Sequence, residues 1–80
     1  MMKPFLLVVT DRDRNEFTVE GPMIDDRPWI DAVVVAQNAG REVNCHTPGA
    51  GTKEDIAQQV KTSLGLQLVC PGSIVTPNSN

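Results

Sequence analysis

Residues 41–64 constrain the fold of this chain more than any other segment. Residues 41–46 alternate apolar and polar side chains, which predicts a β-strand. A turn rich in glycine and proline follows, and Thr52 then begins a well-marked helix that ends before Gly65. A strand, a short turn and a helix in direct succession indicate an α/β arrangement.

The helix over residues 52–64 carries signals at both ends. Thr52 and Asp55 have the spacing of a capping box, and Glu54 places a negative charge in the first turn, where the helix dipole favours it. Gly65 is a natural stop. The apolar stripe on this helix consists of Ile56, Ala57, Val60 and Leu64. We expect this stripe to pack on the sheet against Val43, Cys45 and Leu68.

Three further strands are predicted. Residues 5–10 form a continuous apolar, β-branched run, which is typical of a strand buried on both faces. Residues 16–20 alternate cleanly, and the polar turn between the two runs predicts a hairpin. Asp11, Asp13 and Asn15 resemble the start of a calcium loop, but the required later glycine and acid are missing, so a solvated turn explains them. Residues 66–70 are the last strand.

A first helix is predicted over residues 29–39. Asp25 and Asp26 are candidate N-caps, Pro28 suits a first turn, and Gly40 suits the position after the helix. The β-branched residues 33–35 favour a strand instead. We choose the helix because its length, start signal and stop signal agree.

The predicted order is therefore β-β-α-β-α-β, an α/β (α+β) fold with a mixed four-stranded sheet. Right-handed crossovers place both helices on the same face if the sheet grows in one direction, and on opposite faces if it reverses. We expect a two-layer sandwich with both helices packed on one face. The other face then needs cover from the tail, from Trp29 or from a second subunit, which leaves a homodimer open. Residues 1–75 form a single compact domain, and residues 76–80 form a flexible C-terminal tail.

The composition narrows the classes of function. The net charge of −3 over 80 residues, with cations and acids interleaved, argues against nucleic acid as the partner. Two cysteines are too few for a disulfide scaffold. No apolar run approaches the ~18 residues of a membrane span, and the N-terminal run is too short for a signal peptide. We therefore expect a cytoplasmic protein with no membrane contact.

The loop at residues 47–53 is the candidate ligand site. Its free amides precede a helix, which is where phosphates and carboxylates bind in many proteins. The loop lacks the spacing of a P-loop and of the G-x-G-x-x-G motif, and a flexible connection capped by Thr52 explains it equally well. The candidate ligand-binding residues are Thr47, Gly49, Gly51, Thr52 and Lys53.

A thiol or metal site is the other candidate. We expect Cys45, His46 and Cys70 to gather at the carboxyl-end edge of the sheet, where Asp25 or Asp26 would complete a zinc site. The local cysteine spacing of such sites is absent, and buried free cysteines are commoner. Cys45 and His46 are neighbours on a strand and point to opposite faces, so they cannot act as nucleophile and base.

The expected function is a small soluble, non-catalytic protein–protein interaction module with a regulatory or accessory role. A protein partner or self-association is expected, with no catalytic residue, metal or cofactor. The first alternative is a small-ligand or anion-binding domain that uses the 47–53 loop. The second alternative is a thiol or metal site built from Cys45, His46 and Cys70.

Overall fold

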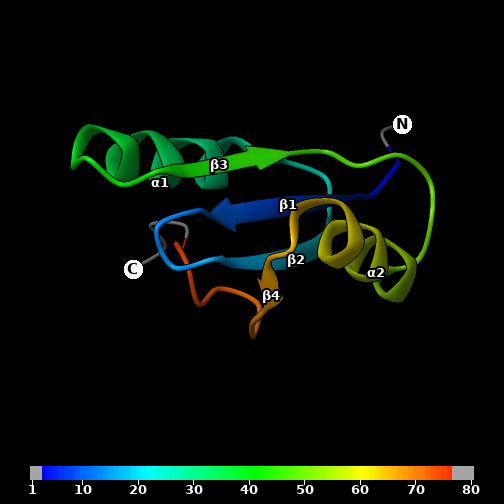
Figure 1. Ribbon diagram of the computed structural model, residues 1–80. Helices are drawn as coiled ribbons and strands as arrows, with labels where there is room; N and C mark the ends of the chain where they lie inside the picture. The colour runs from blue at the N-terminus through cyan, green and yellow to red at the C-terminus, as the bar shows by residue number, and fades with distance from the viewer. Residues whose placement is uncertain (1–2, 77–80) are drawn as a thin grey trace.

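The computed structural model describes residues 3–76. These residues form four strands and two helices in the order β-β-α-β-α-β, which confirms the predicted order, the mixed sheet and the α+β class (Figure 1). The elements are β1 (Phe5–Asp11), β2 (Glu16–Met23), α1 (Arg27–Asn38), β3 (Val43–His46), α2 (Lys53–Leu64) and β4 (Gln67–Leu68). Residues 77–80 of the predicted tail lie outside the described residues.

The four strands lie in the order β3-β1-β2-β4. β1 is antiparallel to both of its neighbours, and β2 is parallel to β4. β2, β3 and β4 therefore run in one direction, with β3 and β4 at opposite edges. A bulge interrupts the hairpin where Gly21 and Pro22 together oppose Leu6. Gly21 has a φ of +110°, and a Cβ there would lie 2.8 Å from the carbonyl oxygen of Phe5, so only glycine fits.

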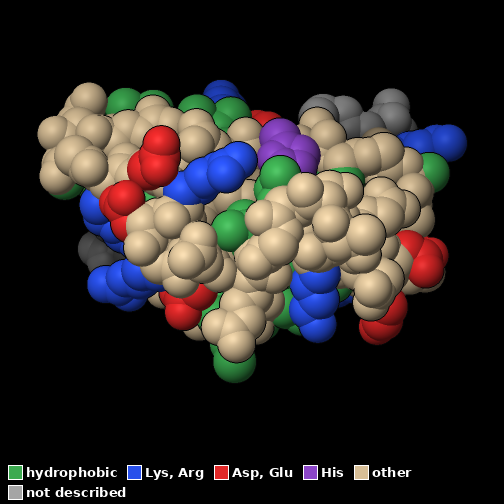
Figure 2. Space-filling view, viewed as in Figure 1, with side chains coloured by type: hydrophobic (Ala, Val, Ile, Leu, Met, Phe, Trp, Pro, Cys, Tyr) green, Lys and Arg blue, Asp and Glu red, His purple; other side chains and the backbone are tan. Residues whose placement is uncertain are grey.

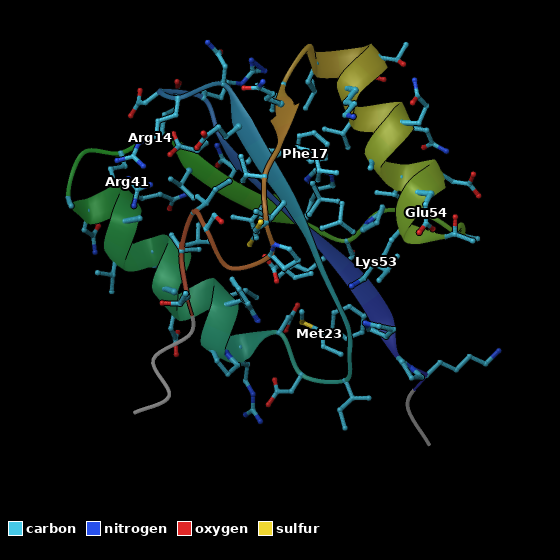
Figure 3. The ribbon with its side chains drawn as sticks, turned by 90° about the horizontal axis from the view of Figure 1, so that it is seen from below. Arg14, Phe17, Met23, Arg41, Lys53 and Glu54 are labelled. Carbon is cyan, nitrogen blue, oxygen red and sulfur yellow. The ribbon has the colours of Figure 1, made fainter. Side chains whose placement is uncertain are left out.

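The two helices cover opposite faces of the sheet, which corrects the predicted placement on one face. Val8 pairs with Val19, and both pack with Ile56 of α2. Leu7 and Val9 alternate with Val8 along β1 and point to the other face, where they pack with α1. Figure 3 shows the sheet between the two helices.

The physical reason for this placement is the strand order. The connection through α1 leads from β2 across β1 to the β3 edge, and the connection through α2 returns across the whole sheet to β4. Each connection joins strands that run in the same direction. Two such crossovers of the same hand lie on opposite faces when the direction of travel reverses. The sequence pattern alone does not reveal that reversal.

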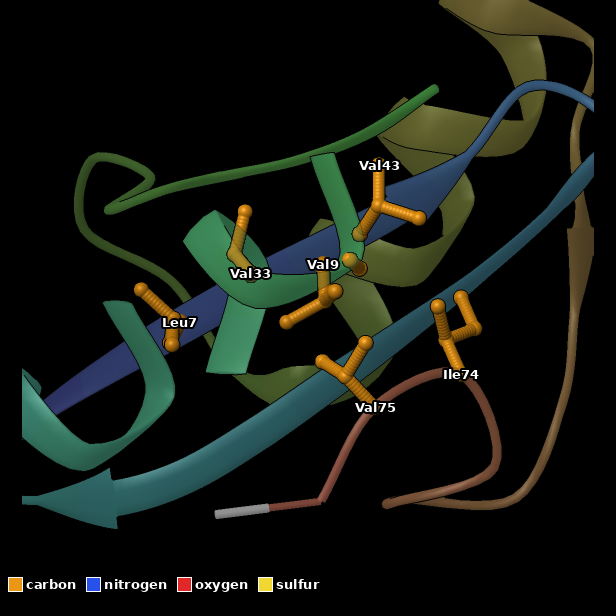
Figure 4. Packing of buried hydrophobic residues seen from close by; sticks show 7 residues of the cluster. Leu7, Val9, Val33, Val43, Ile74 and Val75 are labelled. Atoms are coloured by element: carbon orange, nitrogen blue, oxygen red, sulfur yellow. The ribbon is translucent and has the colours of Figure 1, made fainter. Parts of the chain in front are cut away.

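The α1 face is covered by this chain itself. The buried cluster there consists of Leu7, Val9, Val33, Ala36, Val43, Ile74 and Val75 (Figure 4). Ile74 and Val75 come from the segment after β4, and Trp29 packs against the same cluster. Trp29 was one of the predicted sources of cover, whereas Ile74 and Val75 precede the predicted tail at residues 76–80, and α1 covers the rest of this face.

The α2 face holds the second cluster. Ile56 and Val60 are buried against Val8, Phe17 and other residues of this face. The predicted contact of this helix with Val43 and Cys45 is wrong, because those residues belong to the α1 face. The predicted helix ends are confirmed: the Thr52 hydroxyl accepts from the Asp55 amide at 3.1 Å, and the Asp55 carboxylate accepts from the Thr52 amide at 3.4 Å.

Two residues of the predicted apolar stripe on α2 differ strongly in how far they are buried. Ile56 is 2% exposed, whereas Leu64 in the last turn is 42% exposed. We expect Ile56→Ala to lower the free energy of unfolding by about 2–5 kcal/mol, because it opens a cavity in the core. Leu64→Ala should cost only about 1 kcal/mol, since much of that side chain already meets solvent. Urea midpoints of both variants, with Gln58→Ala as a near-neutral control, check this order. Equal losses for Ile56→Ala and Leu64→Ala would contradict the register of α2.

Asp11, the last residue of β1, is buried and so does not belong to the predicted solvated turn, whereas residues 12–15 of that turn are exposed. The Asp11 side chain is 1% exposed and lies 2.9 Å from the Arg41 guanidinium. Its carboxylate also accepts hydrogen bonds from the amides of Asp13 at 3.0 Å and Arg14 at 3.3 Å. Arg41 donates to the carbonyl of Ile74 at 3.5 Å as well. The pair therefore joins the hairpin, the entry to β3 and the C-terminal segment.

Candidate functional site

A wide, open pocket on the described surface lies beside the predicted ligand loop. It is an open pocket of about 860 Å³ at the start of β1, the end of β2 and the entry to α2. Its lining residues are Pro4, Phe5, Leu6, Pro22, Pro48, Gly49, Ala50, Gly51, Thr52, Lys53 and Glu54. Four of the five candidate ligand-binding residues are among them, and Thr47 is not.

The loop geometry follows from its residues. Gly51 has a φ of +148°, which side chains rarely adopt, and a Cβ there would lie 3.5 Å from the Cβ of Asp55. Thr52 then caps the helix through its hydroxyl. The first backbone amides of a helix have no carbonyl partner within it, so those of Lys53 and Glu54 are available at the pocket. Figure 3 shows both residues at the start of α2.

The charges at this helix end do not favour an anion. Glu54 and Asp55 already place two carboxylates in the first turn, where they complement the dipole. Lys53 contributes one positive charge. The remaining walls are apolar, with Phe5, Leu6 and three prolines. The pocket suits an uncharged, mainly apolar ligand with a hydrogen-bond acceptor for the free amides.

Sequence reasoning missed one side of this pocket. Pro4, Phe5 and Leu6 come from the start of β1, and Pro22 comes from the bulge in β2. These residues lie far from the 47–53 loop in sequence. Only the position of β1 between β3 and β2 brings them beside the loop, and no local motif signals that position.

The thiol and imidazole groups do not converge, so the expected gathering at one edge is wrong. Cys45 packs on the α1 face, whereas His46, the next residue on β3, points to the α2 face, where Figure 2 shows the histidine exposed. Cys70 follows β4, at the opposite edge of the sheet. Within residues 3–76, no group of three or more His, Cys, Asp or Glu side chains is placed to hold a metal.

The environment of Cys45 favours the neutral thiol. Partial burial raises the pKa of the Cys45 thiol above its ordinary value, and the negative charge of Asp26 adds to this effect. A catalytic or metal-binding cysteine needs the opposite shift, because the thiolate is the nucleophile and the ligand. Both cysteines are free.

The two thiols should therefore differ in reactivity. We expect iodoacetamide at neutral pH to modify the exposed Cys70 faster than Cys45 in the folded protein, and both at similar rates in urea. The raised pKa also makes stability depend on pH. The contribution of the Cys45 thiol to the free energy of unfolding is fully present below the pKa of this thiol in the unfolded chain, and it is lost as the pH rises through the pKa in the folded protein. Peptide mass mapping over time measures the two rates. Faster modification of Cys45 would contradict its assigned environment.

The outward side of α1 is unusually apolar. Ile30, Val34 and Val35 are 41%, 45% and 68% exposed, and Ile24 just before the helix is 60% exposed. Val33 and Ala36 are the fully buried residues of this helix. A helix that only covers a sheet normally presents polar residues to solvent. Its exposed valines and isoleucine are therefore a second candidate site.

Comparison with protein-family models, with curated proteins and with solved structures finds no match to this chain. Neither helix within residues 3–76 has the length and apolar character needed to cross a membrane.

Proposed function

We propose that this protein is a non-catalytic protein–protein interaction module with a regulatory or accessory role. The observation that carries the proposal is that α1 leaves three large apolar side chains exposed, those of Ile30, Val34 and Val35. Clusters of exposed apolar residues on small soluble proteins mark interaction sites. The two free thiols suit a reducing compartment such as the cytoplasm, where we place the protein.

The reactive side chains support a non-catalytic role. Catalysis by a thiol needs a nucleophile and a base within hydrogen-bond reach. Cys45 and His46 lie on opposite faces, and Cys70 lies at the far edge. The raised pKa of Cys45 points in the same direction.

A comparison of three baits tests the proposal. The wild-type protein and a variant with Ile30, Val34 and Val35 all changed to Ser are used for affinity purification from the source cells. We expect at least one protein to be retained by the wild type and lost by the variant. The matched control changes Gln58, Gln59 and Thr62 on the exposed side of α2 to Ser. If no protein distinguishes the α1 variant from this control, the interaction role is wrong.

A second function is favoured by the pocket beside α2. We infer that it can hold a small, uncharged, mainly apolar molecule, because its walls are apolar and its free amides come from Lys53 and Glu54. This differs from the anion favoured by the loop alone, since Glu54 and Asp55 occupy the first turn.

Thermal shift with a library of neutral fragments tests this second function. A ligand at 100 times its dissociation constant adds about 2.7 kcal/mol to the free energy of unfolding, which is a visible shift for a small domain. Ala50→Trp should fill the pocket and abolish the shift, whereas Thr62→Trp on exposed α2 should retain it. A library without a single hit, or a hit unaffected by Ala50→Trp, counts against this site.

A further inference from the structure

The outer edge of β3 has backbone groups that face away from the sheet. β3 is an edge strand, and its partner β1 is antiparallel to it. The Arg12 amide donates to the Glu42 carbonyl at 3.1 Å, so this pair is hydrogen-bonded. Hydrogen-bonded and non-bonded pairs alternate along an antiparallel ladder. Cys45, paired with Val9, is therefore in a non-bonded pair, and its N–H and C=O point outward.

Part of this edge is already covered. Gln37 of α1 donates from Nε2 to the Val43 carbonyl at 2.7 Å and lies 3.3 Å from the Asn44 side-chain oxygen. Val43 is the other residue of β3 whose backbone groups face outward, and its carbonyl already accepts the hydrogen bond from Gln37. Residues 44–46 of this strand contain no lysine, proline or bulge, which are features that block the pairing of edge strands.

The exposed flank of α1 lies over the open part of the edge. Ile30, Val34 and Gln37 have the spacing i, i+4 and i+7, so they share one stripe of the helix. Gln37 fixes the direction of that stripe, since its side chain reaches the β3 edge. The charge of Asp26, at the start of α1, acts on Cys45, near the end of β3. Figure 1 shows that α1 and β3 run in opposite directions, so Val34, one turn before Gln37, lies further along β3 than Val43, toward Cys45.

From this arrangement we propose that the β3 edge binds an extended segment of a partner protein, which adds a strand next to Cys45 and packs its apolar side chains on Ile30 and Val34. This rests on the proposed interaction function and names its mode. Outward N–H and C=O groups at strand spacing are matched by another extended backbone, and alternate side chains of the added strand face α1.

The charges near the start of α1 define the partner further. This region has three carboxylates and one guanidinium, which give a local net charge of −2; the residues are Asp25, Asp26, Arg27 and Asp31. Arg27 is already paired with Asp25 at 3.0 Å. A lysine or arginine at the end of the added strand that reaches Asp26 complements this charge. The partner segment is therefore extended, apolar at alternate positions and basic at one end.

Selection of random peptides displayed on phage against the full chain tests this mode. We expect enriched peptides with alternating apolar residues and a terminal lysine or arginine. Val34→Glu should weaken the binding of a synthesised peptide at least about tenfold, whereas Thr62→Glu, on the exposed side of α2, should leave the binding unchanged. N-methylation of every second amide of the peptide can be placed in two alternating sets. Only the set whose N–H groups face β3 should abolish binding when it is methylated.

Amide hydrogen exchange of the wild-type protein gives a readout that needs no variant. Binding of the selected peptide should slow exchange at the Cys45 amide. Peptides that bind without protecting Cys45, and with no loss on Val34→Glu, would overturn this mode and leave the interaction role intact. If selection enriches no peptide, this mode fails, and the affinity purification described above decides the interaction role separately. Concentration-dependent self-pairing that protects Cys45 without peptide would show that a second copy, not a partner segment, occupies the edge.

Discussion

Phe17→Ala should destabilise this protein by about 3–5 kcal/mol. Phe17 is 0% exposed and lies in the cluster between the sheet and α2, with Val8, Val19 and Ile56 among its members. Phe17 is the second residue of β2 and is labelled in Figure 3. Truncation to alanine removes a whole ring from a core that has few other aromatic side chains, and the remaining residues cannot close the cavity. A domain of this size has a marginal total stability, so the variant should be partly unfolded at room temperature.

Urea denaturation followed by circular dichroism measures this loss. The matched control is Phe5→Ala, because Phe5 is only half-buried and borders the pocket beside α2. We expect the midpoint for Phe5→Ala to stay much closer to that of the wild type. Comparable losses for the two variants would show that the α2-face cluster is not the dominant core.

The ends and types of the elements could be predicted because their signals are local. The capping box of Thr52 and Asp55 is encoded within four residues, and the structure contains it. Gly65 adopts a φ of 68° at the end of α2, as a helix stop does. Gly40 follows α1 with a φ of 89°, which agrees with the predicted stop. The start and stop signals also settled the ambiguity of the three valines in α1 in favour of a helix.

The faces could not be predicted because they depend on strand order. Leu7 and Val8 point to opposite faces of β1, and both are buried. Their apolar character in the sequence indicates only that both faces of this strand are covered. Which helix lies on which side depends on the order β3-β1-β2-β4 and on the reversal between the two crossovers. The predicted contacts of α2 and the predicted convergence of Cys45 and Cys70 both failed for this reason.

The residues of the candidate sites could likewise be predicted only where their signals are local in the sequence. Gly49 to Lys53 could be identified from the loop alone, because a helix start is a local signal. The apolar wall at Phe5 and Leu6 could not, since it comes from another strand. Val34 beside the β3 edge was also missed. Its exposure was not evident from its β-branched neighbours, and the edge position of β3 is again a property of the whole sheet.

The ion pair between Asp11 and Arg41 should carry the second large effect. Asp11 is 1% exposed at its side chain and Arg41 is 35% exposed, with 2.9 Å between the carboxylate and guanidinium. Arg41→Ala leaves a buried carboxylate without its charge partner, and such a change costs about 3–5 kcal/mol. The lower end of this range is expected, because the amides of Asp13 and Arg14 still donate to Asp11.

Asp11→Asn separates the charge from the hydrogen bonds. The asparagine oxygen can still accept from the amides of Asp13 and Arg14, but the attraction to Arg41 is lost. We expect Asp11→Asn to cost less than Asp11→Ala, which loses the turn bonds as well. A double-mutant cycle with Asp11→Ala and Arg41→Ala, measured by urea denaturation, gives the coupling energy of the pair. Additive losses in that cycle would mean that Asp11 stabilises the hairpin turn alone, and that Arg41 does not fix the C-terminal segment over the α1 face.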